Sequence, residues 1–104
     1  MTPQWKIAAC VLAAAAAGAA QAQDASALYV RSLAATCASC HGTDGRTAPG
    51  APIAPLAGMQ RDYLLTQLKA FKAGTRPSTI MTQLAKGYSD AQIEQLASYF
   101  AAQK

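Results

Sequence analysis

The apolar positions in the second half of the chain repeat at helical spacing. Over residues 61–73 they predict a helix that Gly74 ends, because glycine commonly follows the last residue of a helix. The positions on its inward face are Leu64, Leu65, Leu68 and Phe71. This helix is therefore expected to pack one face against the rest of the domain.

The segment that follows predicts two more helices. A short one, capped by Ser78 or Thr79, is expected to run through Ala85. Ser89 and Gln92 have the spacing of a capping box, which begins the last helix. The apolar positions of the last helix fall on one face: Ile93, Leu96, Ala97 and Phe100.

Residues 24–59 predict one helix and one long loop. Asp24 or Ser26 can cap a helix that runs to about Cys37. The loop covers residues 41–59, where four glycines and three prolines forbid a continuous helix. No stretch alternates apolar and polar residues as a strand does, so the predicted fold class is all-α, with three to four helices.

Residues 1–22 predict a secretory signal peptide that is cleaved. Met1–Lys6 carries a positive charge, Ile7–Ala20 is an almost unbroken apolar run, and Ala20-Gln21-Ala22 fits the small-x-small cleavage rule. The folded domain is then residues 23–104, exported to the periplasm and not membrane-spanning. The alternative is an uncleaved membrane anchor, for which the run is short and rich in alanine.

The charge of the predicted domain is modest. Without Lys6 it has eight basic and five acidic residues, a net charge of +3. Such a balance does not indicate a nucleic-acid-binding protein. A domain this short buries a limited core and is usually stabilised further by a disulfide, a metal or another bound group. Export places it where disulfides persist.

The candidate attachment site for such a group is the sequence Cys37-Ala38-Ser39-Cys40-His41, which has the C-x-x-C-H pattern that attaches c-type haem. On one helical turn each thiol can form a thioether with a haem vinyl group, and the imidazole can bind the iron. Structural zinc would need four ligands, and residues 23–104 offer two cysteines and one histidine. A thioredoxin-type pair is expected beside a βαβ unit, and a plain disulfide leaves His41 without a role. One covalent haem c is therefore the expected cofactor.

The second axial position of the iron needs a different residue, because His41 is the only histidine in the chain. Methionine, lysine, water or an open position remain. Two methionines follow the predicted cleavage site. Met81 lies between the second and the last predicted helices, where a segment can cross to the side opposite His41, so Met81 is the expected ligand. Met59 lies closer in sequence to His41 and is expected to pack at the haem edge or in the core.

The surroundings of the haem follow less directly from the residues. His41 is expected to donate its other ring N–H to a backbone carbonyl of the proline-rich run 51–55. The candidate partners for the haem propionates are Tyr63, Tyr88 and Arg46. No acid–base constellation that would support catalysis accompanies the motif, so no catalytic residue is expected.

Taken with the proline-rich loop and a methionine before a capped terminal helix, the motif resembles that of the class I c-type cytochromes. The resemblance covers residues 24–103. Three further stretches are similar to the single-haem cytochrome subunit of flavocytochrome c sulfide dehydrogenase, a relative of the cytochrome c4/c5 group: Leu56-Ala57-Gly58-Met59, Arg76-Pro77-Ser78-Thr79-Ile80-Met81 and Ala85-Lys86-Gly87-Tyr88-Ser89-Asp90. The chain departs from the family pattern at Ala54, where a proline is usual.

The resemblance implies a small class I cytochrome c fold around one covalent haem. It implies thioethers at Cys37 and Cys40, axial ligation by His41 and Met81, and electron transfer without catalysis by this chain. It also implies a periplasmic partner, a flavoprotein subunit with FAD that oxidises sulfide and passes electrons to the haem.

Two other functions stay open. A freestanding carrier to a terminal oxidase or reductase would use a basic rim for steering, made of Lys69, Lys72, Arg76 and Lys86. A haem enzyme or gas sensor would need an open sixth position, so that Met81 would not bind the iron.

Overall fold

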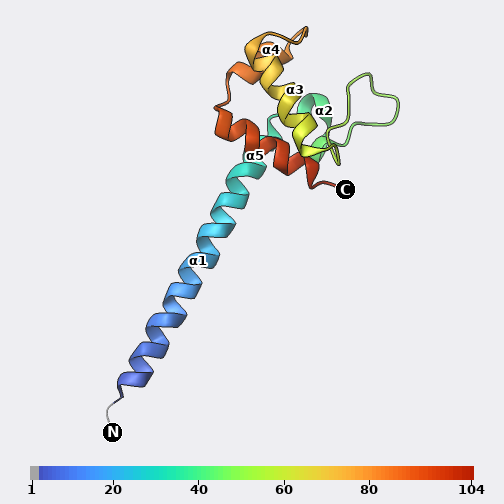
Figure 1. Ribbon diagram of the computed structural model, residues 1–104. Helices are drawn as coiled ribbons and strands as arrows, with labels where there is room; N and C mark the ends of the chain where they lie inside the picture. Colours follow the sequence, from blue (N-terminus) through green and yellow to red (C-terminus); the bar gives the residue numbers. More distant parts are fainter. Residues whose placement is uncertain (1–2) are drawn as a thin grey trace.

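A computed structural model describes residues 3–104 of the chain, and these residues form helices joined by loops, with no strand (Figure 1). The elements in chain order are α1 (Gln4–Ala35), α2 (Ala38–His41), the 3-10 turn η1 (Thr43–Gly45), α3 (Arg61–Ala73), α4 (Met81–Lys86) and α5 (Asp90–Ala101). The all-α class is therefore confirmed.

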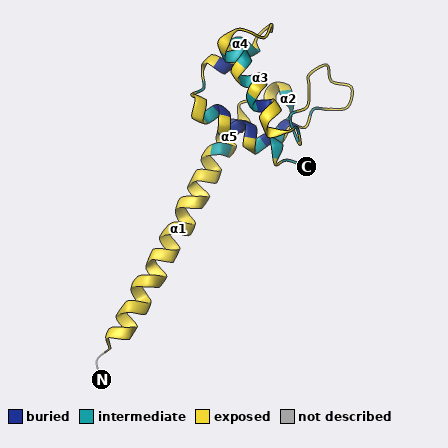
Figure 2. Ribbon diagram, in the orientation of Figure 1, coloured by how far each residue is buried: buried dark blue, intermediate teal, exposed yellow. Residues whose placement is uncertain are grey.

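Helix α1 is a single rod that extends away from the rest of the molecule (Figure 1). The sequence predicted a helix beginning near Asp24 or Ser26, but α1 continues without a break from Gln4, because its alanine-rich stretch strongly favours helix. Residues 3–29 are all exposed (Figure 2), and packing begins only near the C-terminal end of α1. By length and composition α1 can cross a membrane, a test that signal sequences near an N-terminus also pass.

The predicted bounds of the second helix and the predicted start of the last helix are confirmed. Helix α3 ends at Ala73, and Gly74 takes the left-handed conformation with φ +76°. At α5, Ser89 Oγ accepts from the Gln92 N–H at 3.1 Å, while Gln92 Oε1 accepts from the Ser89 N–H at 2.9 Å. The capping box is thus complete in both directions, which sets where α5 begins.

The short helix α4 begins at Met81, slightly later than predicted. Ser78 Oγ nevertheless accepts a hydrogen bond from the Thr82 N–H at 2.9 Å, so one of the two expected capping residues does bind this end of the helix. Met81 is the first residue of α4, and it is half-buried.

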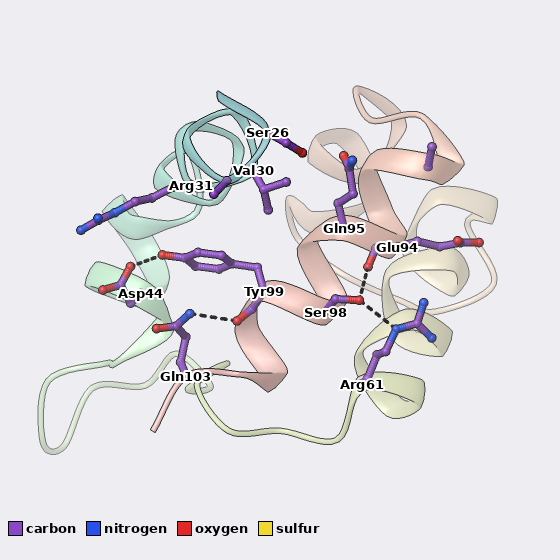
Figure 3. Close-up of a pocket in the computed structure, with 12 residues that line it drawn as sticks. Ser26, Val30, Arg31, Asp44, Arg61, Glu94, Gln95, Ser98, Tyr99 and Gln103 are labelled. Atoms are coloured by element: carbon purple, nitrogen blue, oxygen red, sulfur yellow. Dashed lines mark hydrogen bonds between the residues drawn. The ribbon is translucent and has the colours of Figure 1, made fainter. Parts of the chain in front are cut away.

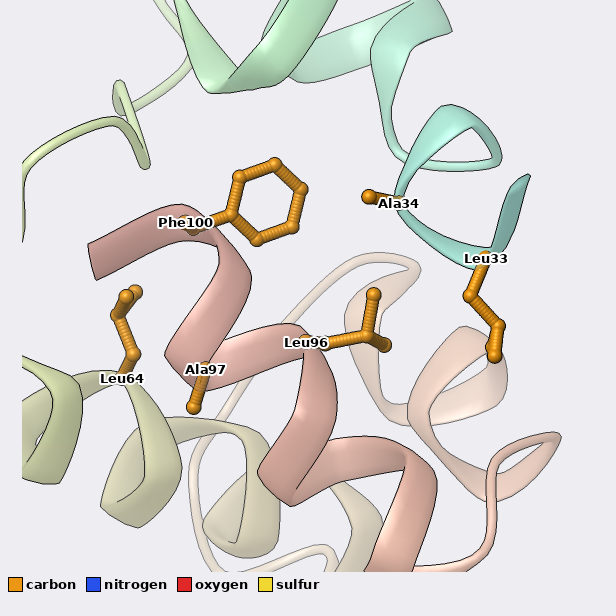
Figure 4. Packing of buried hydrophobic residues seen from close by; sticks show 6 residues of the cluster. All are labelled: Leu33, Ala34, Leu64, Leu96, Ala97 and Phe100. Atoms are coloured by element: carbon orange, nitrogen blue, oxygen red, sulfur yellow. The ribbon is translucent and has the colours of Figure 1, made fainter. Parts of the chain in front are cut away.

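Helix α5 lies at the centre of the core (Figure 4). Its predicted inward face is buried, with Ile93 and Leu96 almost fully enclosed. The cluster that joins it to α1 and α3 consists of Leu33, Ala34, Leu64, Leu96, Ala97 and Phe100. On α3, only Leu64 is buried, while Leu65, Leu68 and Phe71 are half-buried. Two of these, Leu68 and Phe71, face a cavity rather than solid core.

The long loop is tied to the core at both of its ends. The Gly45 carbonyl accepts from the N–H groups of Leu56 and Ala57, at 2.9 and 3.2 Å. The Gly58 N–H donates to the Phe100 carbonyl at 2.9 Å. Gly45 has φ +77°, and a Cβ there would lie 2.9 Å from the Phe100 ring, so only glycine fits this close approach.

Candidate functional site

The C-x-x-C-H motif begins at Cys37, the residue directly before α2, and its other four residues form α2. The His41 N–H donates to the Cys37 carbonyl at 2.9 Å, so the two residues are one helical turn apart. Cys37 is half-buried, Cys40 is exposed, and both are free thiols. Burial raises the pKa of the Cys37 thiol, and the Thr36 hydroxyl partly offsets that effect. Both sulfur atoms are thus available on the same turn.

The orientation of His41 is set by one hydrogen bond. Its Nδ1 lies 2.7 Å from the Ala54 carbonyl oxygen. Because a carbonyl oxygen only accepts, Nδ1 carries the proton, and Nε2 keeps the lone pair that binds a metal. The expected carbonyl from residues 51–55 is thereby confirmed. The residue that stands in place of the family's proline provides it, since every residue has a backbone carbonyl.

A cavity of about 160 Å³ brings three of the four predicted site residues together, and Cys40 is not among the residues that line it. Cys37 and His41 line it, and so do both candidate methionines, Met59 and Met81. Met59 also packs against the core cluster, as expected for a gap-filling methionine. Since both methionines reach the cavity, ligation by Met81 stays a prediction.

Of the three candidate propionate partners, only Tyr63 lines the cavity. Tyr88 instead hydrogen-bonds Thr36 Oγ1, and Arg46 donates to the Lys104 carbonyl at 2.9 Å. Sequence reasoning missed two polar lining residues, Gln67 and Arg76. Gln67 could have been found from its place one helical turn beyond Tyr63, whereas Arg76 reaches the cavity only through tertiary packing.

Two of the four residues of the basic rim pair with carboxylates of α5. Lys69 Nζ lies 3.8 Å from Glu94, and Lys72 Nζ lies 2.9 Å from Asp90. The hydrogen bond from Lys72 lowers the pKa of Asp90. Lys72 also donates to the Tyr88 carbonyl at 2.8 Å. These two lysines therefore join α3 to α5, and the carboxylates beside them reduce the positive charge that they offer for steering.

A larger open hollow of about 1020 Å³ lies between α1 and α5, away from the cysteine motif (Figure 3). Its polar groups mostly bind one another. Tyr99 donates to Asp44, which lowers the pKa of that carboxyl, and Arg61 Nε donates to Ser98 Oγ at 2.9 Å. The smaller cavity is the candidate site, because it alone gathers thiol, imidazole and thioether groups.

A helical domain with a C-x-x-C-H motif, in which the first cysteine and the oriented histidine line one apolar cavity, is by class a small c-type cytochrome. The family model for cytochrome c matches residues 15–104. The chain therefore belongs to the cytochrome c family, and its cofactor is covalently bound haem c. The residues present fit that group, since free thiols, an imidazole with an available Nε2 and an apolar cavity occur together.

Two known cytochromes are similar to this chain. The cytochrome subunit of sulfide dehydrogenase from Chlorobaculum tepidum is 44% identical over 43 residues, which are 41% of this chain and 39% of the relative. The solved structure of cytochrome c4 from Acidithiobacillus ferrooxidans is 41% identical with a TM-score of 0.59. That match covers 64% of this chain and 38% of the other. The chain thus spans about two fifths of the length of each relative, and the second match supports the class I cytochrome c fold.

Proposed function

We propose that this chain transfers single electrons in the periplasm through one haem c. In this proposal Cys37 and Cys40 carry the thioethers, and the iron ligands are His41 and Met81. The observation that supports it best is the hydrogen bond from His41 Nδ1 to Ala54, which leaves Nε2 free for the iron. Haem c supplies a one-electron iron couple, and a methionine ligand raises its potential.

The methionine assignment is tested with a matched pair of variants, Met81→Ala and Met59→Ala. Met81→Ala is expected to abolish the far-red sulfur-to-iron absorption band of the oxidised protein, whereas Met59→Ala is expected to keep it. Loss of the band only in Met59→Ala would move the ligand to Met59. Absence of the band in the unmutated protein would instead favour the haem enzyme or gas sensor with an open sixth position.

The proposed partner is a sulfide-oxidising flavoprotein, for which this chain would be the electron-accepting subunit. Its support is the relative named a cytochrome subunit of sulfide dehydrogenase. The freestanding carrier is the alternative, and the ion pairs of Lys69 and Lys72 weaken the basic rim on which its steering would depend.

The partner is tested by purifying the tagged chain from its native host. A flavoprotein that copurifies, together with reduction of the haem when sulfide is added, is the expected result. A chain that purifies alone, is not reduced by sulfide and exchanges electrons with an oxidase would make it a freestanding carrier.

Export is the remaining part of the proposal. Its support is the apolar N-terminal segment, which is exposed throughout and contributes nothing to the core. Mass spectrometry of the protein from the periplasmic fraction is expected to find Gln23 as the first residue. A full-length chain in the membrane fraction would show an uncleaved anchor instead.

A further inference from the structure

The cavity lined by His41 and Met81 has a polar corner that the proposed function does not use. It is formed by Tyr63 and Gln67 of α3 and by Arg76, which follows α3. Tyr63 and Gln67 are four positions apart and therefore share one face of the helix. Most of the remaining lining is apolar, and Arg76 is the one lysine or arginine among the lining residues that the structure describes.

Two neighbours hold the Arg76 side chain at this corner. Its Nη1 donates to Gln67 Oε1 at 2.6 Å. Its Cζ lies 4.5 Å from the centroid of the Phe71 ring, which is a cation–π distance. Since Gln67 and Phe71 line the cavity themselves, the guanidinium is held against the cavity wall.

The charge of Arg76 has no carboxylate partner within residues 3–104. The ion pairs there involve other cations, namely Arg46, Arg61, Lys69 and Lys72. A guanidinium has five N–H donors, of which Gln67 receives one. The planar fork that remains suits a carboxylate, with which it can form two parallel hydrogen bonds.

We infer that Arg76 binds a carboxylate of the cofactor, a haem propionate, and that Gln67 and Phe71 position it for this contact. The inference rests on the proposed function, because it needs haem ligated by His41 in this cavity. Apart from the iron, the charges of a haem are on its propionates. The described lining contains no carboxylate, so Arg76 is the group that complements them.

Loss of this pair is expected to lower the reduction potential. Without Arg76, the negative charge of the propionate is no longer offset and favours ferric iron. A unit charge about 10 Å away, at an effective dielectric constant of about 20, shifts an equilibrium roughly tenfold. For a one-electron couple that corresponds to a fall of about 59 mV in midpoint potential.

The experiment uses the exported holoprotein and compares Arg76→Gln with Arg76→Lys and Arg61→Gln. Arg61 is the first residue of α3 and binds Ser98 in the hollow, so its replacement removes an equal charge outside the haem cavity. Arg76→Gln is expected to lower the potential and to shift the propionate-bending band in the resonance Raman spectrum. Arg76→Lys should restore most of the potential, because it keeps the charge, but not the band position, because it lacks the fork. Arg61→Gln should leave the band unchanged.

An unchanged potential and Raman band in Arg76→Gln, with haem attached and the far-red band present, would overturn the inference and leave the proposed function standing. Absence of covalent haem from the unmutated protein would overturn the proposed function itself. If Arg76→Gln fails to mature, Gln67→Leu provides the same test, since it keeps the charge and removes the group that holds it. A shifted propionate band in Gln67→Leu supports the inference, and an unshifted band overturns it.

Discussion

Replacement of Gly42, the residue directly after the histidine of the motif, should destabilise the protein more than replacement of any glycine in open space. Gly42 has φ +78° and ψ 163°, a backbone region that is essentially restricted to glycine. A Cβ there would lie 2.0 Å from the Arg46 carbonyl oxygen and 2.6 Å from its carbon. Backbone cannot rotate away as a flexible side chain can, so the turn after His41 has to move.

The size of the effect follows from two contributions to the free energy of unfolding. An alanine held in this region costs about 1–3 kcal/mol. Forcing additional atoms into a packed site costs about 1–3 kcal/mol more, so Gly42→Ala is expected to lose roughly 2–6 kcal/mol. Gly50→Ala is the matched control, since Gly50 has φ +79° with no atom within 4 Å of the added Cβ. Its expected loss is about 1–2 kcal/mol.

Thermal unfolding of the two holoproteins, followed by far-UV circular dichroism, measures the difference. The mid-range losses differ by about 2.5 kcal/mol, and 1 kcal/mol corresponds to about 4–8 °C in a domain of this size, so Gly42→Ala is expected to melt about 10–20 °C below Gly50→Ala. Equal melting temperatures would show that the contact with Arg46 does not limit this turn, and the steric reasoning would be refuted.

Three further predictions concern α5 and its neighbours. Tyr99→Phe removes the hydrogen bond that most strongly lowers the pKa of Asp44, so an NMR titration should find that pKa closer to its ordinary value; no change would contradict the contact. Lys72 lowers the pKa of Asp90 in the folded state, so this pair stabilises the protein above the ordinary pKa near 4 and the contribution is lost as pH falls through the lowered value. Asp90→Asn should therefore flatten the fall in stability toward acid pH, measured by urea unfolding, and a parallel curve would argue against the pair. Ser89→Ala should cost about 1 kcal/mol in the same assay through loss of its cap, and Ser89→Gly clearly less.

The bounds of α3 and α5 could be predicted because local residues set them. Gly74 ends one helix and the capping box begins the other, and neither depends on distant packing. The start of α1 was predicted wrongly for a related reason. Asp24 and Ser26 can cap a helix, but the alanine-rich residues before them favour helix themselves, so α1 continues through these two positions.

The candidate site likewise contains residues that the local sequence predicts and residues that only tertiary packing brings to the cavity. Cys37, Cys40 and His41 are adjacent in sequence, so their pattern alone predicts the chemistry. The choice between Met59 and Met81 depends on how separate segments fold against the cavity, and both segments reach it. Polar lining residues such as Arg76 could not be predicted from the local sequence either. Arg76 lies in the loop after α3, and the end of a helix does not indicate which way a loop side chain points.

The hydrogen bond between His41 and Ala54 has a consequence for how stability and redox behaviour can vary separately. Ala54 is exposed and lies outside the core cluster, so the group that holds the imidazole belongs to the surface. With His41 as the proposed ligand, the basicity of its ring responds to the position of this carbonyl. Substitutions in the loop of residues 48–55 can then change the potential while the free energy of unfolding stays nearly constant. The reduction potential of this domain can therefore be tuned through a surface segment that is separate from its packed core.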